Sequence, residues 1–299
     1  MNIGRTTFVM FPNFKREIID TGEVKINLVR GGSGLPILLL HGYPQTHVIW
    51  HKIAAKLAEK FTVTATDLRG YGDSDKPPAN SDHSNYSKRT MARDQITVMS
   101  QLGYQQFYLV GHDRGARVAH RLALDYPERV KKLVLLDIAP TYDMYAAADQ
   151  EFATAYYHWF FLIQPYPFPE TLISANPDYF LRHCLQSWSA DLTAFPAEAC
   201  AEYLRCFRKP ETIHATCEDY RASATIDLED DAADREHKIE CPLLVMWGKK
   251  GLIERKYDVL ATWRKRAINV SGISLDCGHF LPEEAPQATY HNILDFLKN

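Results

Sequence analysis

The sequence predicts an α/β fold in which a mostly parallel sheet carries helices on both faces and is interrupted by an inserted helical cap domain. Short apolar runs recur along the chain, helical stretches lie between most of them, and one long segment lacks such runs. Strands that alternate with helices are typical of a parallel sheet covered on both sides. The 299 residues, 46% hydrophobic and 24% charged, suit one globular α/β domain with an insertion.

Several segments have the pattern of strands. Residues 25–30 alternate between apolar and polar side chains, which predicts a half-exposed strand. Residues 36–40 form an unbroken apolar run, which predicts a strand that is buried on both faces. Residues 61–66 are expected to form the next strand, and residues 273–275 the last one. The short apolar pattern returns at residues 107–110, 133–136 and 243–246, with helical stretches at residues 91–102 and 116–126.

The alternation of strands and helices breaks after Pro140. From residue 142 to about residue 226 the chain has no run of the parallel-strand type and is rich in aromatic residues and proline. We therefore expect a core formed by residues 1–141 and 227–299, with residues 142–226 as a helical cap. The alternative interpretation of this segment is a separately folded domain.

Composition narrows the classes of function. A net charge of −3 gives no indication of a nucleic-acid or membrane-surface partner. The six cysteines form no C-x-x-C pair, so we interpret them as reduced thiols and expect no metal site. The N-terminus lacks a basic segment followed by an apolar stretch, and no apolar run approaches the length of a membrane span. We expect a cytoplasmic protein that needs no cofactor.

The segment Val110-Gly111-His112-Asp113-Arg114-Gly115 carries the strongest chemical signal. It ends an apolar run and opens a helical one, which is the context of the nucleophile elbow G-x-S-x-G of α/β-hydrolases. Here Asp113 stands in the place of the serine. A carboxylate attacks a saturated carbon and forms an alkyl ester, whereas a serine forms acyl-enzymes from esters and amides. The alternative role for Asp113 is that of a helix cap.

An alkyl ester on Asp113 must be hydrolysed, which requires a base and a carboxylate that orients it. His279 follows the last expected strand, in the α/β-hydrolase order of nucleophile first and histidine last. Gly251 occupies the position where many hydrolases carry the acid after W-G. We therefore choose Asp137, which leaves the preceding strand, over the weaker candidates Glu254 and Asp258. A loop histidine without function is the alternative for His279.

Three further residues near the elbow are candidates for binding. The loop that begins at His41 resembles the oxyanion loop of this fold, so we expect the backbone amides of Tyr43 and Arg114 to stabilise an oxyanion. Arg114 and Arg117 share one face of a helix and match the geometry of a carboxylate. They predict a small anionic substrate that carries a leaving group. A solvated helix face is the alternative.

Over its whole length the chain resembles the fluoroacetate (haloacetate) dehalogenase family of α/β-hydrolases. The motifs at residues 41–47 and 67–74 are shared with epoxide hydrolases and haloalkane dehalogenases. Those two families typically carry tryptophan where this chain has Arg114. The motifs are residues 41–47 (HGYPQTH), 67–74 (DLRGYGDS), 111–117 (GHDRGAR) and 157–160 (YHWF).

The resemblance implies a halide pocket formed by His158, Trp159 and Tyr220, whose ring N–H and O–H groups can donate to a leaving fluoride. A buried aromatic stripe of the cap is the alternative for these residues. The resemblance also implies a homodimer, which the sequence itself does not indicate.

Together these observations predict a hydrolytic dehalogenase that converts short 2-haloacids, such as fluoroacetate or chloroacetate, and water to glycolate and halide through an alkyl-aspartate ester. An epoxide hydrolase with the same nucleophile is the alternative; it needs two cap tyrosines, such as Tyr220 with Tyr142, Tyr156 or Tyr157. An uncharged epoxide would leave two buried guanidinium groups without a partner. A non-catalytic receptor on a hydrolase scaffold is a more remote alternative.

Overall fold

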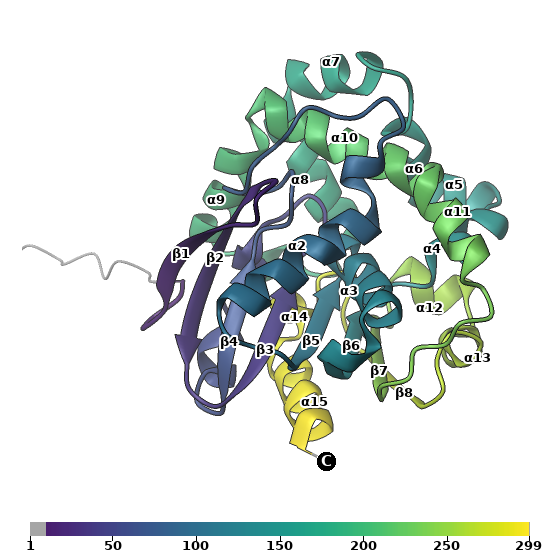
Figure 1. The fold of residues 1–299 in the computed structure, drawn as a ribbon. Helices are drawn as coiled ribbons and strands as arrows, with labels where there is room; N and C mark the ends of the chain where they lie inside the picture. The colour runs from purple at the N-terminus through teal and green to yellow at the C-terminus, as the bar shows by residue number, and fades with distance from the viewer. Residues whose placement is uncertain (1–9, 299) are drawn as a thin grey trace, which may run out of the picture.

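The computed structural model of the chain describes residues 10–298, which form an eight-stranded sheet with helices on both faces (Figure 1). Across the sheet the strands follow the order β1-β2-β4-β3-β5-β6-β7-β8. The β1–β2 and β2–β4 pairs are antiparallel, and every pair from β4 to β8 is parallel. The strands are β1 Lys15–Asp20, β2 Lys25–Gly32, β3 Leu35–Leu40, β4 Phe61–Thr66, β5 Phe107–His112, β6 Val130–Leu136, β7 Leu243–Gly248 and β8 Val270–Leu275.

The expected strands are present, and the structure adds β1, which the sequence did not indicate. The expectation of a half-exposed strand at residues 25–30 is wrong, because residues 26–29 are all buried and the polar side chain of Asn27 bonds to Asp67. β1 is an edge strand whose side chains are mostly exposed, including Ile18, so it lacks an apolar signal. The central strands are buried on both faces because helices cover both sides of the sheet. Adjacent residues of one strand therefore pack in opposite layers. In β5, for example, Leu109 packs in the cluster on one face and Val110 in the cluster on the other.

The helices divide into those of the core and those between β6 and β7. The core α-helices are α1 Ala54–Leu57, α2 Lys88–Gln101, α3 Arg114–Asp125, α12 Leu252–Lys256, α13 Val259–Arg264, α14 Leu281–Glu284 and α15 Pro286–Lys298. The 3-10 helices are His47–Trp50, Ser84–Tyr86, Pro127–Arg129 and Leu192–Ala194. The inserted helices are α4 Thr141–Ala146, α5 Gln150–Ala155, α6 His158–Phe161, α7 Phe168–Ala175, α8 Pro177–Trp188, α9 Ala197–Phe207, α10 Pro210–Ala224 and α11 Ile226–Ala233.

The segment between β6 and β7 is therefore helical, with no strand among its residues. Most of its helices lie together at one end of the sheet, at the top of the view in Figure 1. The division into a core and a cap of residues 142–226 stays a prediction, and the last inserted helix continues to Ala233. The arrangement leaves the turn between β5 and α3 enclosed between sheet and inserted helices.

Candidate active site

The turn between β5 and α3 holds Asp113 in an unusual backbone conformation, with φ 49° and ψ −116°. Two glycines permit this turn to pack closely. A Cβ atom at Gly42 would lie 2.4 Å from the Cβ of Asp113, and one at Gly115 would lie 2.3 Å from the carbonyl oxygen of His41. Strain of this kind is found where a side chain must be presented at a site. The turn thus directs the Asp113 carboxylate toward the inserted helices from the amino end of α3.

The structure brings the three predicted catalytic side chains together. His279 Nδ1 lies 2.5 Å from Asp137 Oδ2, and His279 Nε2 lies 3.7 Å from Asp113 Oδ2. The other Asp137 oxygen accepts a hydrogen bond of 2.8 Å from the Gly248 amide. All three side chains are buried. One imidazole nitrogen is therefore held by a carboxylate while the other faces the proposed nucleophile.

The competing acids lie elsewhere or are engaged in other contacts. Glu254 accepts a hydrogen bond from the indole N–H of Trp247, and Asp258 caps α13 through the Ala261 amide. A Cβ atom at Gly251 would lie 3.7 Å from Asp137 Oδ2. Gly251, after β7, therefore lies close to the carboxylate of Asp137, after β6, which contacts the histidine.

The electrostatics suit a carboxylate and a base. Burial alone would raise the pKa of Asp113, but the neighbouring His279, His112 and two arginines outweigh it and lower that pKa. Burial alone would lower the pKa of His279, and the hydrogen bond and charge of Asp137 outweigh it and raise that pKa. At neutral pH Asp113 is an anion, and the carboxylate of Asp137 stabilises any proton that His279 accepts.

One of the two predicted oxyanion donors already contacts Asp113. The backbone N–H of Tyr43 donates to Asp113 Oδ1 over 2.8 Å. The second, the amide of Arg114, belongs to the first turn of α3, where N–H groups have no acceptor within the helix. The Asp113 oxygen held by Tyr43 is thus distinct from the one that faces His279.

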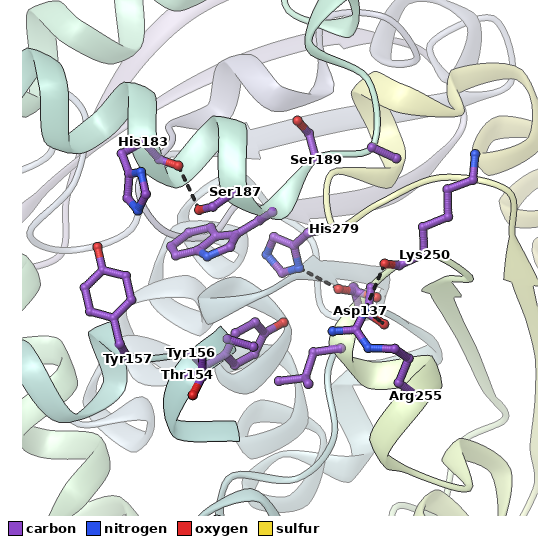
Figure 2. A pocket seen from close by; sticks show the side chains of 15 residues that line it. Asp137, Thr154, Tyr156, Tyr157, His183, Ser187, Ser189, Lys250, Arg255 and His279 are labelled. Atoms are coloured by element: carbon purple, nitrogen blue, oxygen red, sulfur yellow. Dashed lines mark hydrogen bonds and ion pairs between the residues drawn. The ribbon is translucent and has the colours of Figure 1, made fainter. Parts of the chain in front are cut away.

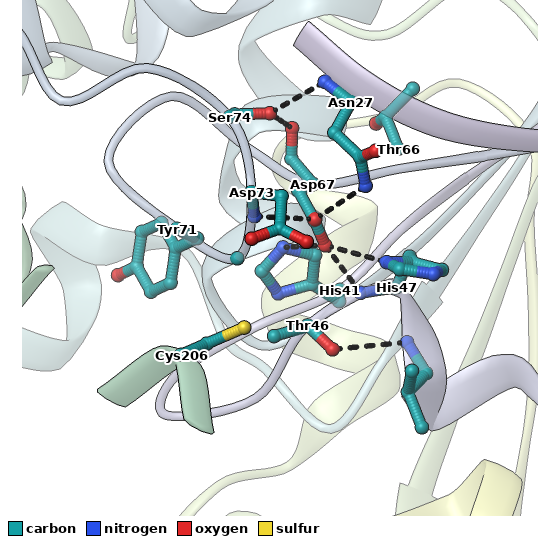
Figure 3. A network of polar contacts seen from close by, with 12 residues as sticks. Asn27, His41, Thr46, His47, Thr66, Asp67, Tyr71, Asp73, Ser74 and Cys206 are labelled. Carbon is teal, nitrogen blue, oxygen red and sulfur yellow. Dashed lines mark hydrogen bonds and ion pairs between the residues drawn. The ribbon is translucent and has the colours of Figure 1, made fainter. Parts of the chain in front are cut away.

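A buried network around Asp67 fixes the loop that carries Tyr43 (Figure 3). Asp67 accepts hydrogen bonds of 2.8 Å from the backbone and the ring of His47 and from the side chain of Asn27. It also accepts the Asp73 amide at 2.9 Å. His41 Nε2 accepts the amide of Leu68 at 3.1 Å. The motif after β4 therefore has a structural use: its carboxylate anchors the loop next to the nucleophile.

The two predicted carboxylate-binding arginines are buried and have different partners. Arg114 pairs with Asp219 of α10, through Nε at 2.8 Å and Nη2 at 2.9 Å, and its Nη1 has no hydrogen-bond partner within residues 10–298. Arg117 donates to the Ala139 carbonyl and the Thr141 hydroxyl, and its Nε has no partner in the same part of the chain. Among residues 10–298, each guanidinium therefore keeps one nitrogen without a hydrogen-bond partner.

His158, Trp159 and Tyr220 lie together although two of them come from α6 and the third from α10. The ring centroids of His158 and Tyr220 are 5.6 Å apart, and those of Trp159 and Tyr220 are 6.4 Å apart. The guanidinium of Arg114 lies 4.1 Å from the Tyr220 ring centre, and that of Arg117 lies 4.6 Å from the Trp159 ring centre. Both groups of predicted binding residues thus form one cluster.

Polar atoms without a partner mark the inside of this cluster. Among the described residues, His158 Nδ1 and the Tyr220 hydroxyl are buried without a hydrogen bond, as are the Tyr43 hydroxyl and the Trp188 indole N–H. Buried polar groups normally have partners, so such a concentration is typical of a ligand site. Burial lowers the pKa of His158 to about 3, so its imidazole is neutral and carries one N–H donor.

Sequence reasoning missed three residues of this cluster. The Tyr43 amide was expected at the site but its side chain was not, and Trp188 has no motif, because the packing of the inserted helices brings both rings against His158. Asp219 lies in the segment Glu218-Asp219-Tyr220-Arg221, whose three charged residues are buried in α10. This concentration of charge was the one sequence signal that could have indicated Asp219.

A pocket of about 340 Å³ reaches the histidine from between the inserted helices and the core (Figure 2). Asp137, Tyr156, Trp188 and His279 line its inner part, whereas Asp113 is not among its lining residues. Lys250 and Arg255 belong to its wall and are half exposed. The pocket therefore reaches the base, and Tyr156 and Trp188 lie between it and the cluster around the arginines.

A group of possible metal ligands occurs away from this site. Glu170, His214 and Glu218 lie close together on the inserted helices. Arg221 Nη1 bonds to both carboxylates, at 2.7 and 2.6 Å, so each carboxylate already has a guanidinium partner. These residues do not fit a metal ion. None of the helices within residues 10–298 is long and apolar enough to cross a lipid bilayer.

The sheet, the strained turn at its centre and the inserted helices define an α/β-hydrolase. A family model of the alpha/beta hydrolase fold matches residues 36–286. The chain is 46% identical to a fluoroacetate dehalogenase of Burkholderia sp, with 97% of this chain and 96% of the relative covered. It therefore belongs to the haloacetate dehalogenase family of α/β-hydrolases and is a hydrolytic enzyme.

Other relatives show how this family borders on its neighbours. A soluble epoxide hydrolase of Corynebacterium sp. is 35% identical over 91% of this chain and 93% of its own length. A solved structure of a protein provisionally assigned as an alpha/beta hydrolase from Nostoc sp PCC 7120 is 70% identical, with a TM-score of 0.95 and coverage of 95% of this chain and 98% of that one. The fold class and the family predicted from the sequence are confirmed.

Proposed function

We propose that the protein hydrolyses the carbon–halogen bond of short 2-haloacids, such as fluoroacetate and chloroacetate, to glycolate and a halide ion. The observation that carries the proposal is the pair of buried arginines beside Asp113, each with an unpartnered nitrogen. A fluoroacetate dehalogenase with 46% identity supports this choice of substrate class. The residues needed are all in the chain, and the proposed reaction uses no metal or cofactor.

In the first half-reaction the free nitrogens of Arg114 and Arg117 hold the substrate carboxylate. Asp113 Oδ2 attacks the α-carbon, a carbon–oxygen bond forms, and the halide leaves with the electrons of the broken carbon–halogen bond. His158, Trp159 and Tyr220 donate hydrogen bonds to the halide. Fluoride is a poor leaving group, so donors that act most strongly on the departing ion lower the barrier.

In the second half-reaction His279 removes a proton from water, whose oxygen attacks the carboxyl carbon of Asp113. Negative charge develops on Oδ1, which accepts the Tyr43 amide over 2.8 Å, and the Arg114 amide is the proposed second donor. The carbon–oxygen bond to glycolate then breaks, and the proton on His279 goes to the leaving oxygen. Asp137 stabilises the imidazolium through its contact of 2.5 Å.

Epoxide hydrolysis is the second candidate, because a soluble epoxide hydrolase of 35% identity is among the relatives. The unpartnered Tyr220 hydroxyl is suited to activating an epoxide oxygen. Buried Arg117 weighs against this activity, since it has no carboxylate partner among residues 10–298 and a neutral substrate supplies none. A receptor without catalysis is disfavoured because Asp113, Asp137 and His279 are all present and in contact range.

The first test is incubation of the purified protein with fluoroacetate, chloroacetate and styrene oxide, with halide and diol release as the readouts. We expect halide from at least one haloacid and no diol. Turnover of the epoxide alone would refute the proposed activity. The same assay gives the preferred halogen, which depends on pocket dimensions set by residues such as Tyr156, Tyr157 and Ile163.

We further propose that the enzyme is a cytoplasmic homodimer whose partners are the small substrate and water. The location rests on the pattern of unpaired cysteines, and the dimer rests on family resemblance. Light scattering on the purified chain tests the dimer: the mass of a single chain across a range of concentrations would refute it.

A further inference from the structure

Four buried charged side chains meet where the inserted helices cover α3. Arg114 and Lys88 come from the core, and Asp219 and Asp227 come from α10 and α11. Asp219 bonds to Arg114 through both of its oxygens and also accepts from Lys88, which lies 3.2 Å from Asp227. Two cations thus face two carboxylates, and their charges cancel locally.

Asp219 has further contacts that hold it in place. The Tyr71 hydroxyl donates to its Oδ2 over 2.6 Å, and its backbone carbonyl accepts from Arg114 Nη2 at 2.9 Å. The side chain of Asp219 is fully buried. A bidentate pair of this geometry fixes the plane of the guanidinium, so the position of Nη1 is set from the inserted helices.

Arg117 has no comparable partner. Its Nη1 donates to the Ala139 carbonyl at 3.1 Å and to the Thr141 hydroxyl at 3.0 Å, and its Nη2 contacts the Met144 sulfur. These acceptors are all neutral. Within residues 10–298 the guanidinium makes no ion pair with a carboxylate. Burial lowers the pKa of Arg117, and the positive charge of Arg114 lowers it further.

The two guanidinium groups therefore offer a ligand different things. Arg114 offers a hydrogen-bond donor on a guanidinium that pairs directly with Asp219, and Arg117 offers a donor on a guanidinium without a direct carboxylate partner among residues 10–298. The Asp113 carboxylate acts on Arg117 at longer range and raises its pKa. When Asp113 becomes a neutral ester in the proposed reaction, this compensation is lost, and an anion on the bound alkyl group restores it.

We propose that Arg117 recognises the charge of the substrate carboxylate, and that Asp219 is a positioning residue for Arg114. Asp219 neutralises the charge of Arg114 and fixes the orientation of its free Nη1 donor. This inference rests on the proposed function for the identity of the substrate. It leaves Arg117 as the guanidinium of this pair without a direct carboxylate partner among residues 10–298, which matches a substrate with a single carboxylate. Discrimination between an anion and a neutral molecule of the same shape is then a property of Arg117 and Asp219.

The test compares the binding of glycolate with that of glycolamide, its neutral analogue, by titration calorimetry. We expect the wild-type protein to prefer glycolate. Arg117→Gln should reduce the ratio of the two affinities by at least about tenfold, because a charge-assisted hydrogen bond contributes about 1.5–3 kcal/mol. Arg114→Gln should weaken both ligands alike and keep the ratio.

Asp219→Asn extends the test without removing an arginine. Asparagine keeps an oxygen for Arg114 but not the charge, so glycolate should bind several-fold more tightly relative to glycolamide. Arg121→Gln is the matched control, because Arg121 is a buried arginine of the same helix that pairs with Asp125 and Asp234. It should leave the ratio unchanged, and thermal melting verifies that each variant is folded.

Three results would overturn the inference: a wild-type protein without preference for glycolate, loss of the preference in Arg114→Gln, or an unchanged ratio in Asp219→Asn. The last measurement stands even if Arg117→Gln does not fold. Binding does not require turnover, so the test distinguishes failure of this inference from failure of the proposed activity. A protein that releases no halide but shows the expected ratios refutes the dehalogenase function alone.

Discussion

His279 and Asp113 act in different half-reactions of the proposed mechanism, so a single substitution separates them. His279→Ala removes the base but leaves the nucleophile and both arginines in place. We expect the Asp113 peptide to gain the mass of one carboxymethyl group after incubation with chloroacetate, with one halide ion released per chain. Peptide mass spectrometry checks both.

The double variant His279→Ala with Asp113→Asn is the control for that experiment and should release no halide. Continued multiple turnover by His279→Ala without any adduct on Asp113 would contradict the two-step scheme.

The convergence of positions 137 and 251 gives a prediction about the orienting acid. Asp137→Asn should slow hydrolysis of the ester by about 10²–10⁴-fold, the usual contribution of a general base, and lower the pKa of His279. Adding Gly251→Asp should restore at least about tenfold of that loss, because its Cβ would start 3.7 Å from the lost carboxylate oxygen. Steady-state halide release measures both effects.

Gly251→Asn in the Asp137→Asn background is the matched control, with the same shape and no charge. It should restore nothing. Equal recovery by both substitutions would show that volume, rather than a carboxylate, matters at position 251.

At the residue scale, the sequence indicated Asp113, His279 and Asp137 because each follows a recognisable apolar run. Their order along the chain, with the nucleophile first and the histidine last, can be read directly from the sequence. The pairing of Arg114 with Asp219 could not be predicted, because 105 positions separate the two residues and only the packing of α10 brings them together. For the same reason the sequence suggested two equivalent arginines where the structure has two different ones.

At the scale of elements, buried strands were predictable and other elements were less so. β3, β5 and β7 carry apolar runs, and β6 does so from Leu133, because the sheet is covered on both faces. β4 alternates with threonine although all of its residues are buried. β1 is stabilised by pairing with β2 rather than by burial, so it leaves no apolar signal. The ends of the inserted helices depend on contacts between them, which explains why only their general helical character was foreseen.

The loop after β3 depends on one carboxylate from the end of β4, which gives an element-scale prediction. Asp67→Ala leaves the buried amide and ring of His47 and the Asn27 side chain without their acceptor. We expect a loss of at least about 3 kcal/mol in the free energy of unfolding, measured with urea. Asp295→Ala, at an exposed position of α15, is the control and should cost under about 0.5 kcal/mol. A comparably small loss for Asp67→Ala would contradict the structural role of the network.

At the scale of the whole molecule, Glu283 links three parts of the chain that form the site. It accepts hydrogen bonds from Gln45 at 2.5 Å and from the Tyr203 hydroxyl at 2.9 Å. Gln45 belongs to the loop that carries Tyr43, Tyr203 to α9 of the insertion, and Glu283 to α14, which follows His279. His51, Lys52, Cys200 and Glu284 are the other titratable groups near it. A buried carboxyl group thus joins the oxyanion loop, the segment of the base and the inserted helices.

The protonation of Glu283 should make this junction depend on pH. Burial raises its pKa from 4.5 to about 8, so the folded protein holds the proton that the unfolded chain releases. The resulting stability is complete below about pH 4.5 and is lost as the pH rises toward about 8. A difference of one between the folded and unfolded pKa values corresponds to about 1.4 kcal/mol of stability. Glu283→Gln, which cannot ionise, should therefore melt at progressively higher temperature than the wild type as the pH is raised from 5 to 8.

The difference in melting temperature between the two proteins is the informative quantity, because all other titrating groups contribute equally to both. Glu198→Gln, at an exposed position at the start of α9, controls for the loss of a carboxyl group and should give a difference that does not change with pH. The same flat difference for Glu283→Gln would mean that Glu283 titrates alike in the folded and unfolded chains. A growing difference would instead mean that ionisation of Glu283 weakens the folded state, so that stability should decline between about pH 4.5 and about pH 8 at the junction that holds Tyr43 and His279.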